Sequence, residues 1–273
     1  MPNPAEVTNM ALFCDFENVA LGVQDAKYDK FDIGKVIERL LLKGSIVVKK
    51  AYCDWDRYKE FKAPMHEAAF EMIEIPHVRQ SGKNSADIRM VVDALDLCYT
   101  KAHVDTFVII SGDSDFSPLV SKLRENAKRV IGVGVKNSTS DLLIANCDEF
   151  IFYDDLVREQ KKTAARRAPR KPVAAAEGAT PAKKGDDTRR QEALDLIAET
   201  VEALIAERGE DEKVWGSMVK QALKRRKPGF SESYYGFRSF NGLLEEAERG
   251  GALKLERDEK SGGYIVRLQS TSD

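Results

Sequence analysis

The sequence contains no uninterrupted apolar run of roughly 18 residues, the length that a membrane-spanning helix requires. Its beginning, MPNPAEVTNM, has neither the basic nor the apolar part of a secretory signal peptide. Nothing in the sequence points to export or membrane insertion, so we expect a cytoplasmic protein.

Cysteine is scarce, and the four cysteines lie far apart in or beside apolar segments. They form neither a zinc-ligand spacing nor a disulfide framework, so we expect buried thiols at Cys14, Cys53, Cys98 and Cys147. The P-loop motif GxxxxGK followed by Ser or Thr is missing, and GVGVKN lacks the full dinucleotide-binding fingerprint. These absences argue against P-loop nucleotidases and dinucleotide-dependent enzymes.

The net charge of −2 hides a strong asymmetry along the chain. Residues 1–157 carry 19 Lys and Arg against 25 Asp and Glu, a net charge of −6. Residues 158–190 carry 11 against 4, a net charge of +7, and the remainder carries 13 against 16, a net charge of −3. An acidic domain next to a basic segment fits a polyanionic partner that the basic segment grips, while metal cations occupy an acidic site.

The 273 residues suffice for one domain of ordinary size and a smaller one. In the first part of the chain, β-branched and aromatic runs alternate with amphipathic segments. The pattern predicts strands at 11–15, 45–52, 73–78, 106–111, 130–135 and 150–152, and helices at 32–43, 63–72, 85–99, 116–126 and 139–145. Such alternation predicts an α/β fold, with a mostly parallel sheet and helices on both faces.

Composition divides the chain into three parts. We expect residues 1–157 to form the α/β domain. Residues 158–190 are rich in Lys, Arg, Ala and Pro and have almost no large apolar side chains to bury. This composition predicts a basic flexible linker. Residues 191–273 regain a periodic pattern. Expected helices at 191–208, 214–225 and 240–250 and strands at 253–257 and 264–268 indicate a small winged-helix-like module.

The stretch VDTFVIISGDSDFSPL, residues 104–119, carries the strongest functional signal. A buried strand is followed at once by Gly112, which permits a sharp turn, and by Asp113 and Asp115. Ligands bind at the carboxyl ends of strands in open α/β sheets, so these carboxylates are candidates for chemistry. Polar residues before a helix also serve as N-caps, which accounts for one of the two aspartates but not for both.

Two residues at the end of the first strand and just after it join this set. Asp15 ends its strand, and in a parallel sheet that places it at the same edge as Asp113 and Asp115. Asn18 follows and either orients a ligand or phosphate or caps a helix after the strand.

Asp87 completes the acidic set. It shares a helix face with Val91, Ala94 and Cys98, which should pack on the sheet, so Asp87 points inward in the first helical turn. The alternative is a favourable charge at a helix N-terminus. Asp93 and Asp96 fall outside this stripe, and we expect them to be solvated.

Converging carboxylates repel one another. For two carboxylate charges about 4 Å apart, at an effective dielectric constant of about 20, the repulsion is on the order of 4 kcal/mol. Such a cluster therefore needs a counter-charge. An oxygen-only site suits Mg²⁺ or Mn²⁺. Two such ions can clamp an in-line attack of water on a phosphodiester. A phosphatase with an aspartyl nucleophile usually has a second Asp two residues after the first-strand Asp. This chain has Glu17 at that position, which argues against a phosphatase of this kind.

In this order, FCDFENV, GKNSADIRMVVDAL, FVIISGDSDFSPLV and the GVGV strand resemble a NYN domain of the PIN-like nuclease superfamily, over about residues 8–155. The resemblance implies metal-dependent ribonuclease activity. It matches Asp15, Asp87, Asp113 and Asp115 to the family's acidic positions and Asn18 to its accompanying Asn.

The tail VWGSMVKQALKRRKPGFSESYYGFRSFNGLLEEA resembles the OST-HTH/LOTUS domain, which implies binding to RNA or, in some settings, to protein helicases. Its basic cluster lies next to aromatic residues that could stack on bases. The candidate RNA contacts are Lys224, Arg225, Arg226, Lys227, Tyr234 and Tyr235. Phe237, Phe240 and Leu243 are expected in the core.

The leading hypothesis is a Mg²⁺- or Mn²⁺-dependent endoribonuclease that acts on single-stranded or structured RNA and has a separate RNA-binding module. The alternative is a non-catalytic RNA-binding regulator or adaptor that uses the acidic domain for metal-assisted binding only. A complete set of carboxylates favours the enzyme.

Overall fold

The computed structural model of the protein describes residues 8–75, 85–166, 181–209, 212–258 and 262–269. The chain divides into two units, Met1–Ala168 and Pro169–Asp273, each with its own sheet. Every helix in the described ranges falls short of the length or apolar character that crossing a membrane would need.

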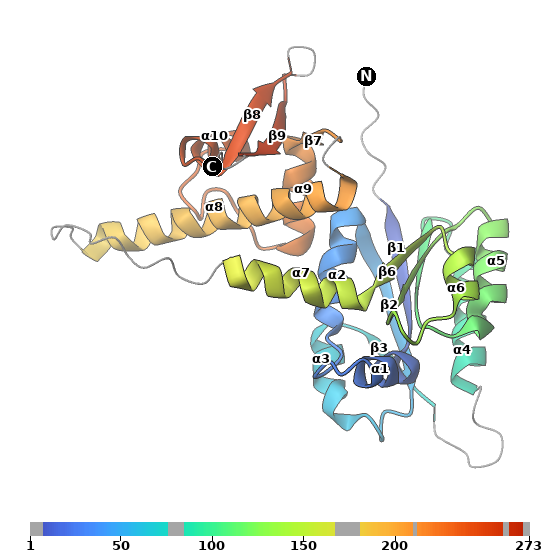
Figure 1. The fold of residues 1–273 in the computed structure, drawn as a ribbon. Coiled ribbons are helices and arrows are strands. Elements are labelled where there is room, and N and C mark those ends of the chain that lie inside the picture. The colour runs from blue at the N-terminus through green and yellow to red at the C-terminus, as the bar shows by residue number, and fades with distance from the viewer. Residues whose placement is uncertain (1–7, 76–84, 167–180, 210–211, 259–261, 270–273) are drawn as a thin grey trace. The chain divides into compact units, whose positions relative to one another are not determined.

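The first unit is built on a six-stranded sheet whose neighbouring strands all run parallel. The spatial order is β3-β2-β1-β4-β5-β6. Figure 1 labels β1, β2, β3 and β6 of this sheet. The strands are β1 (Asn9–Asp15), β2 (Ser45–Cys53), β3 (Glu71–Glu74), β4 (Thr106–Ile110), β5 (Arg129–Gly134) and β6 (Glu149–Phe152). The predicted α/β fold with a parallel sheet is confirmed.

The two central strands, β1 and β4, create the place where a site can form. The chain runs outward from β1 to β3, returns to β4 and runs outward again to β6, so the strand order reverses between β1 and β4. In open α/β sheets, ligands bind outside the carboxyl ends of the strands at such a point. Register pairs Cys14 with Ile110, so Asp15 and Ser111 follow at the same edge.

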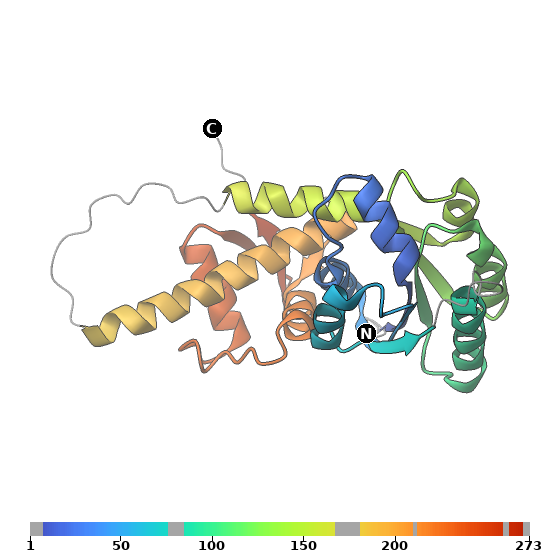
Figure 2. The same ribbon diagram turned by 90° about the horizontal axis from the view of Figure 1, so that it is seen from below.

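Helices cover both faces of this sheet, as the view from below shows (Figure 2). One face carries α1 (Phe16–Asp25), α2 (Ile33–Lys43), α3 (Lys62–Glu67) and α7 (Tyr153–Arg166). The other carries α4 (Ser85–Thr100), α5 (Ser117–Glu125) and α6 (Asp141–Asn146). Two short 3₁₀ helices, η1 (Lys59–Phe61) and η2 (Ser114–Phe116), complete the described part of the unit.

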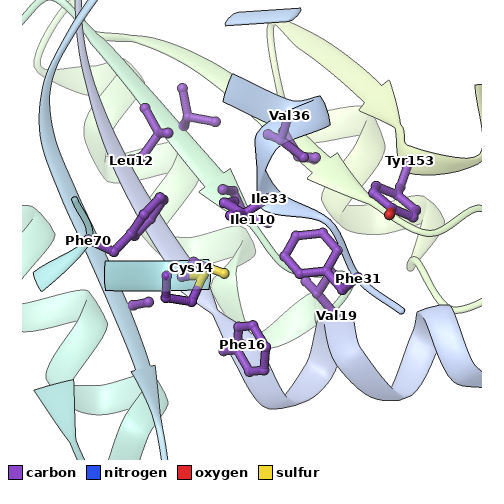
Figure 3. Packing of buried hydrophobic residues seen from close by; sticks show 14 of the residues in the cluster. Leu12, Cys14, Phe16, Val19, Phe31, Ile33, Val36, Phe70, Ile110 and Tyr153 are labelled. Atoms are coloured by element: carbon purple, nitrogen blue, oxygen red, sulfur yellow. The ribbon is translucent and has the colours of Figure 1, made fainter. Parts of the chain in front are cut away.

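An aromatic cluster on the first face fixes the start of α1. Figure 3 shows two of its members, Phe16 and Phe31, in the buried core. The Phe16 ring contacts four other rings at centroid distances between 5.0 and 5.9 Å, those of Phe31, Trp55, Tyr58 and Phe61. Because Phe16 directly follows β1, this packing holds the residues on either side of it in place. The sequence pattern does not predict α1, since its apolar stripe is short and interrupted by polar residues.

Helices α7 and α8 extend into residues 158–190, so the predicted flexible linker is wrong at both ends. Tyr153 and Leu156 anchor α7 in the core, and the Arg, Lys, Gln and Ala residues that follow have high helix propensity. The centre of the predicted linker, residues 167–180, lies outside the described residues.

The second unit contains a three-stranded antiparallel sheet in the order β7-β9-β8. Its elements are α8 (Pro181–Arg208), β7 (Val214–Trp215), α9 (Gly216–Arg226), α10 (Phe240–Arg249), β8 (Leu253–Arg257) and β9 (Tyr264–Leu268). The helix expected from residue 214 begins two residues later, because Val214 and Trp215 pair with β9. Phe237, Phe240 and Leu243 are buried, as expected.

Replacing Phe107 by Ala should lower the free energy of unfolding of the first unit by about 3–5 kcal/mol, because it leaves a cavity in a close-packed core. Phe107 is fully buried on β4, and its ring stacks on that of Phe13 at 6.0 Å. Urea unfolding followed by Trp55 fluorescence, in a Trp215→Phe background, measures this. Val47→Ala, at an exposed β2 position, is the matched control, and equal midpoints for the two variants would contradict the core assignment.

Candidate active site

Asp15 lies at the base of the candidate site and is only 7 % exposed. Its Oδ2 accepts a hydrogen bond from Ser111 Oγ at 3.0 Å, and its Oδ1 accepts one from the backbone N–H of Asn18 at 3.4 Å. The second bond makes Asp15 the N-cap of α1. The carboxylate is therefore oriented both by its own helix and by the residue that follows β4.

Asn18 ties α1 to the loop after β4, because its Oδ1 accepts a hydrogen bond from the backbone N–H of Gly112 at 2.8 Å. The capping position that was the alternative for Asn18 is taken by Asp15. Gly112 is needed for close approach: a Cβ there would lie 2.4 Å from the carbonyl oxygen of Ser138 and 3.0 Å from Thr139 Cα. Asn18 thus positions the loop that carries the next two carboxylates.

Asp113 is the N-cap of η2 and Asp115 lies within η2, in the loop that follows β4. Asp113 Oδ1 accepts a hydrogen bond from the backbone N–H of Asp115 at 2.9 Å and so caps η2, while its own N–H donates to Ser111 Oγ at 3.1 Å. Capping therefore accounts for the position of Asp113. Asp115 is exposed, and capping does not account for it.

Asp87 lies in the first turn of α4, partly buried, and shares an electrostatic environment with the other carboxylates. Burial raises the pKa of Asp87 to about 6, and the charges of Asp113 and Asp115 add to the rise. Burial likewise raises the pKa of Asp15 to about 7, helped by the charge of Asp87 and opposed by the hydrogen bonds from Ser111 and Asn18. The charges of Asp113 and Asp115 act on Asp87, and the charge of Asp87 acts on Asp15, so Asp87 links the four aspartates selected from the sequence electrostatically.

Glu17 also acts on this cluster, although the sequence reasoning does not select it as a site residue. It lies in the first turn of α1, and its charge contributes to the raised pKa of Asp87 after the larger effects of burial, Asp113 and Asp115. Its Oε1 accepts a hydrogen bond from Arg57 Nη1 at 3.0 Å. The sequence signal for Glu17 is its position two residues after Asp15, the aspartate that ends β1.

The expectation that Asp93 is solvated is wrong. Its carboxylate accepts hydrogen bonds from Tyr52 Oη at 2.9 Å, Arg89 Nε at 3.0 Å and Lys50 Nζ at 3.3 Å. Helix α4 buries Met90 fully in addition to the expected Ala94 and Cys98, with Val91 packed on the core in part, and its Asp93 meets Tyr52 on β2. Asp93 is therefore a structural tie, whereas Asp96 is exposed as expected.

The donor chemistry of the cluster fits a hard divalent cation. Its groups are carboxylates, an amide and a hydroxyl, all oxygen donors of the kind that Mg²⁺ and Mn²⁺ prefer. Among the described residues, no three Asp, Glu, His or Cys side chains already surround one point as ligands. A cation here would therefore rely on water or substrate oxygens for part of its coordination, which is usual for Mg²⁺. The cysteines are free thiols, buried at Cys14, Cys53 and Cys98 and partly exposed at Cys147.

The candidate RNA contacts in the second unit differ in how accessible they are. Lys224 and Lys227 are exposed at the end of α9. Arg226 instead forms an ion pair with Glu199 at 3.2 Å, and burial lowers the pKa of the half-buried Arg225. The basic cluster is thus only half available to a partner.

The tyrosines form an aromatic surface with an arginine that the sequence reasoning assigns to the linker. Tyr234 is 61 % exposed, and the guanidinium of Arg189 lies 5.4 Å from the centroid of its ring. Tyr235 stacks on Phe230 at 5.1 Å. Arg190 lies similarly over Phe237, at 5.2 Å. Helix α8 begins earlier than expected and thereby brings these arginines to the aromatic residues.

Comparison with known proteins gives relatives that match about half of the chain. The uncharacterized protein MJ0482 of Methanocaldococcus jannaschii is 26 % identical over 138 residues, 48 % of this chain and 54 % of that protein. The chain therefore spans little more than half the length of this relative. The crystal structure of VPA0982, a protein of unknown function from Vibrio parahaemolyticus, is 26 % identical with a TM-score of 0.50 and covers 56 % of this chain and 98 % of its own.

The family assignment comes from the model of the NYN domain, which matches residues 9–154. This range begins at β1 and ends just after β6, so it contains the whole parallel sheet and all four aspartates. NYN domains generally have the PIN-like nuclease fold, are typically nucleases and generally use divalent metals. The chain therefore belongs to the NYN domain family.

Proposed function

We propose that the protein is a Mg²⁺- or Mn²⁺-dependent endoribonuclease that hydrolyses RNA phosphodiesters at Asp15, Asp87, Asp113 and Asp115. The observation that carries this proposal is the electrostatic coupling of Asp87, in the first turn of α4, with Asp15, Asp113 and Asp115, which follow or end β1 and β4. Like charges that act on one another cost stability, and carboxylates with pKa values raised in this way are candidates for a functional site. Membership of a family of nucleases supports the same reaction class.

In this proposal the four aspartates hold the cations, and the remaining residues orient the aspartates. Bound divalent ions would activate water for attack and stabilise the leaving oxygen. Ser111 fixes the Asp15 carboxylate and the backbone of Asp113 through one hydroxyl group. Asn18 holds the loop at Gly112, so it acts as a positioning residue rather than as a ligand.

We assign the second unit as an OST-HTH/LOTUS-like winged-helix module that binds RNA. Three helices with a small antiparallel sheet, an exposed tyrosine and two exposed lysines support this assignment. Stacking on aromatic residues and contacts to phosphates are the usual means of binding single-stranded RNA.

The deciding experiment incubates the purified protein with end-labelled and circular single-stranded RNA, in Mn²⁺, Mg²⁺ or chelator. Cleavage of the circle in metal but not in chelator identifies a metal-dependent endonuclease, because an exonuclease has no end to attack. Binding of RNA without cleavage of either substrate would favour the non-catalytic regulator instead.

Replacing Asp113 by Asn should lower cleavage of circular RNA by at least about a hundredfold, because a ligand of the proposed cations loses its charge. The fold should be retained, since the Asn oxygen can still accept the hydrogen bond from the Asp115 N–H. Asp96→Asn, an exposed position on α4, is the matched control and should cleave like the parent. Parental rates for Asp113→Asn, measured with the same labelled circle, would place the site elsewhere.

Without metal, the free energy of unfolding should fall as pH rises from about 5 to 8. Asp15 and Asp87 have folded-state pKa values of about 7 and about 6, above the roughly 3.9 of an unfolded aspartate, so the folded state binds more protons in this window. Melting temperatures measured by calorimetry in chelator should show this slope, and Asp15→Asn should reduce it. Mn²⁺ should stabilise the parent more at pH 8 than at pH 5, since only ionised carboxylates bind it.

Asp93→Asn is the matched control for this pH dependence. Burial alone would raise the pKa of Asp93, but the hydrogen bond from Tyr52 and the charge of Lys50 lower it overall. This carboxylate is therefore ionised in both states above pH 5, and its replacement should lower stability evenly without changing the slope. An unchanged slope in Asp15→Asn would contradict the assignment of Asp15 as the buried titrating group.

Charge reversal of both exposed lysines, Lys224→Glu with Lys227→Glu, should weaken RNA binding by the full chain. Each lost phosphate contact should lower the slope of log affinity against log salt by roughly 0.7 for a single strand. Arg249→Glu, an exposed position on α10, is the matched control. Fluorescence anisotropy across a salt series measures both quantities. Affinities and slopes equal to those of the parent would indicate that this unit docks a protein instead.

A further inference from the structure

A hollow lies beside the candidate site, between η2, the first turns of α5 and the start of α6. The described residues that line it are Ser114, Asp115, Ser117, Pro118, Ser121 and Leu142. It is shallow and wide open to solvent, with a volume of about 620 Å³. Because Asp115 belongs both to the hollow and to the carboxylate cluster, a group seated in the hollow lies next to the proposed reaction centre.

Leu142 gives the hollow an apolar wall that the fold itself does not use. It is 58 % exposed in the first turn of α6, whereas the adjacent Leu143 is buried in the core. The wall is fixed relative to the site, because the Ser140 N–H donates to the Gly112 carbonyl at 2.9 Å and Ser140 caps the helix at Leu142. Pro118, exposed at the start of α5, adds a second apolar surface.

Serine residues supply the polar part of the lining. Ser117 is 6 % exposed and its hydroxyl is buried, so this hydroxyl is out of reach of a group in the hollow. The hydroxyls of Ser114 and Ser121 lie on residues of the same lining, and each can donate and accept.

We propose that this hollow is the subsite for the nucleobase next to the scissile phosphodiester, an inference that rests on the proposed ribonuclease function. The described lining contains no Lys or Arg and one carboxylate, so it does not suit a phosphate. A nucleobase is a flat neutral ring with a polar edge. Its face fits against Leu142 and Pro118 while its edge meets the hydroxyls of Ser114 and Ser121, as splayed single-stranded bases are bound in other proteins.

The test is an abasic scan. A short single-stranded RNA is made with one base removed at each position in turn, and kcat/KM for cleavage in Mn²⁺ is measured for each substrate. At one position next to the cleaved bond, removing the base should lower kcat/KM of the parent about fivefold, the loss expected for one apolar contact. Leu142→Ala should show the same loss with intact RNA and no further loss with the abasic RNA.

Val47→Ala, another exposed aliphatic position of this unit, is the matched control and should behave like the parent. The proposal is overturned if no abasic position matters, or if Leu142→Ala retains the full abasic penalty. If neither intact nor abasic RNA is cleaved, the proposed ribonuclease function fails. The hollow is then judged by anisotropy in chelator: a preference for intact over abasic RNA that Leu142→Ala loses supports it, and equal binding refutes it.

Discussion

The parallel pairing of β1 with β4 is the constraint on which the first unit depends. Because Cys14 lies opposite Ile110, the next residues, Asp15 and Ser111, leave the sheet together. One serine hydroxyl can then donate to the Asp15 carboxylate and accept from the Asp113 N–H. A shift of register by one residue would turn both side chains to the other face and take this hydroxyl out of reach.

This arrangement concentrates negative charge at one edge of the sheet, and the rest of the unit tolerates it through packing. The two cores on either face of the sheet and the rings around Phe16 stabilise the strands that carry the carboxylates. Charges elsewhere are matched, as in the Lys50, Tyr52 and Arg89 contacts to Asp93. The two cores therefore offset the electrostatic cost of the like charges at the edge of the sheet.

The sequence predicts those features that depend on periodicity and chain order. Strand-ending aspartates and alternating elements are sufficient to place Asp15, Asp113 and Asp115 at one edge, and the helical stripe is sufficient to turn Asp87 inward. Features that depend on tertiary contacts cannot be predicted from the sequence in this way. Asp93 meets Tyr52 on β2, and Asn18 binds a backbone amide that is far away in the sequence. The arginines over the tyrosine surface were assigned to a linker, since their helix is held by packing that composition does not reveal.

The double role of Asp15 bears on how this protein could diverge. Asp15 caps α1 as well as facing the other carboxylates, so its loss would loosen a helix that the core needs. Asp115 is exposed, and Asp87 begins a helix whose packing lies further along, so either could change at little structural expense. In relatives that lose the activity, we would then expect substitutions at Asp115 and Asp87 before substitutions at Asp15. Inactive relatives would keep Asp15 because it caps the helix. An alignment in which Asp15 is lost before the other aspartates would contradict this order.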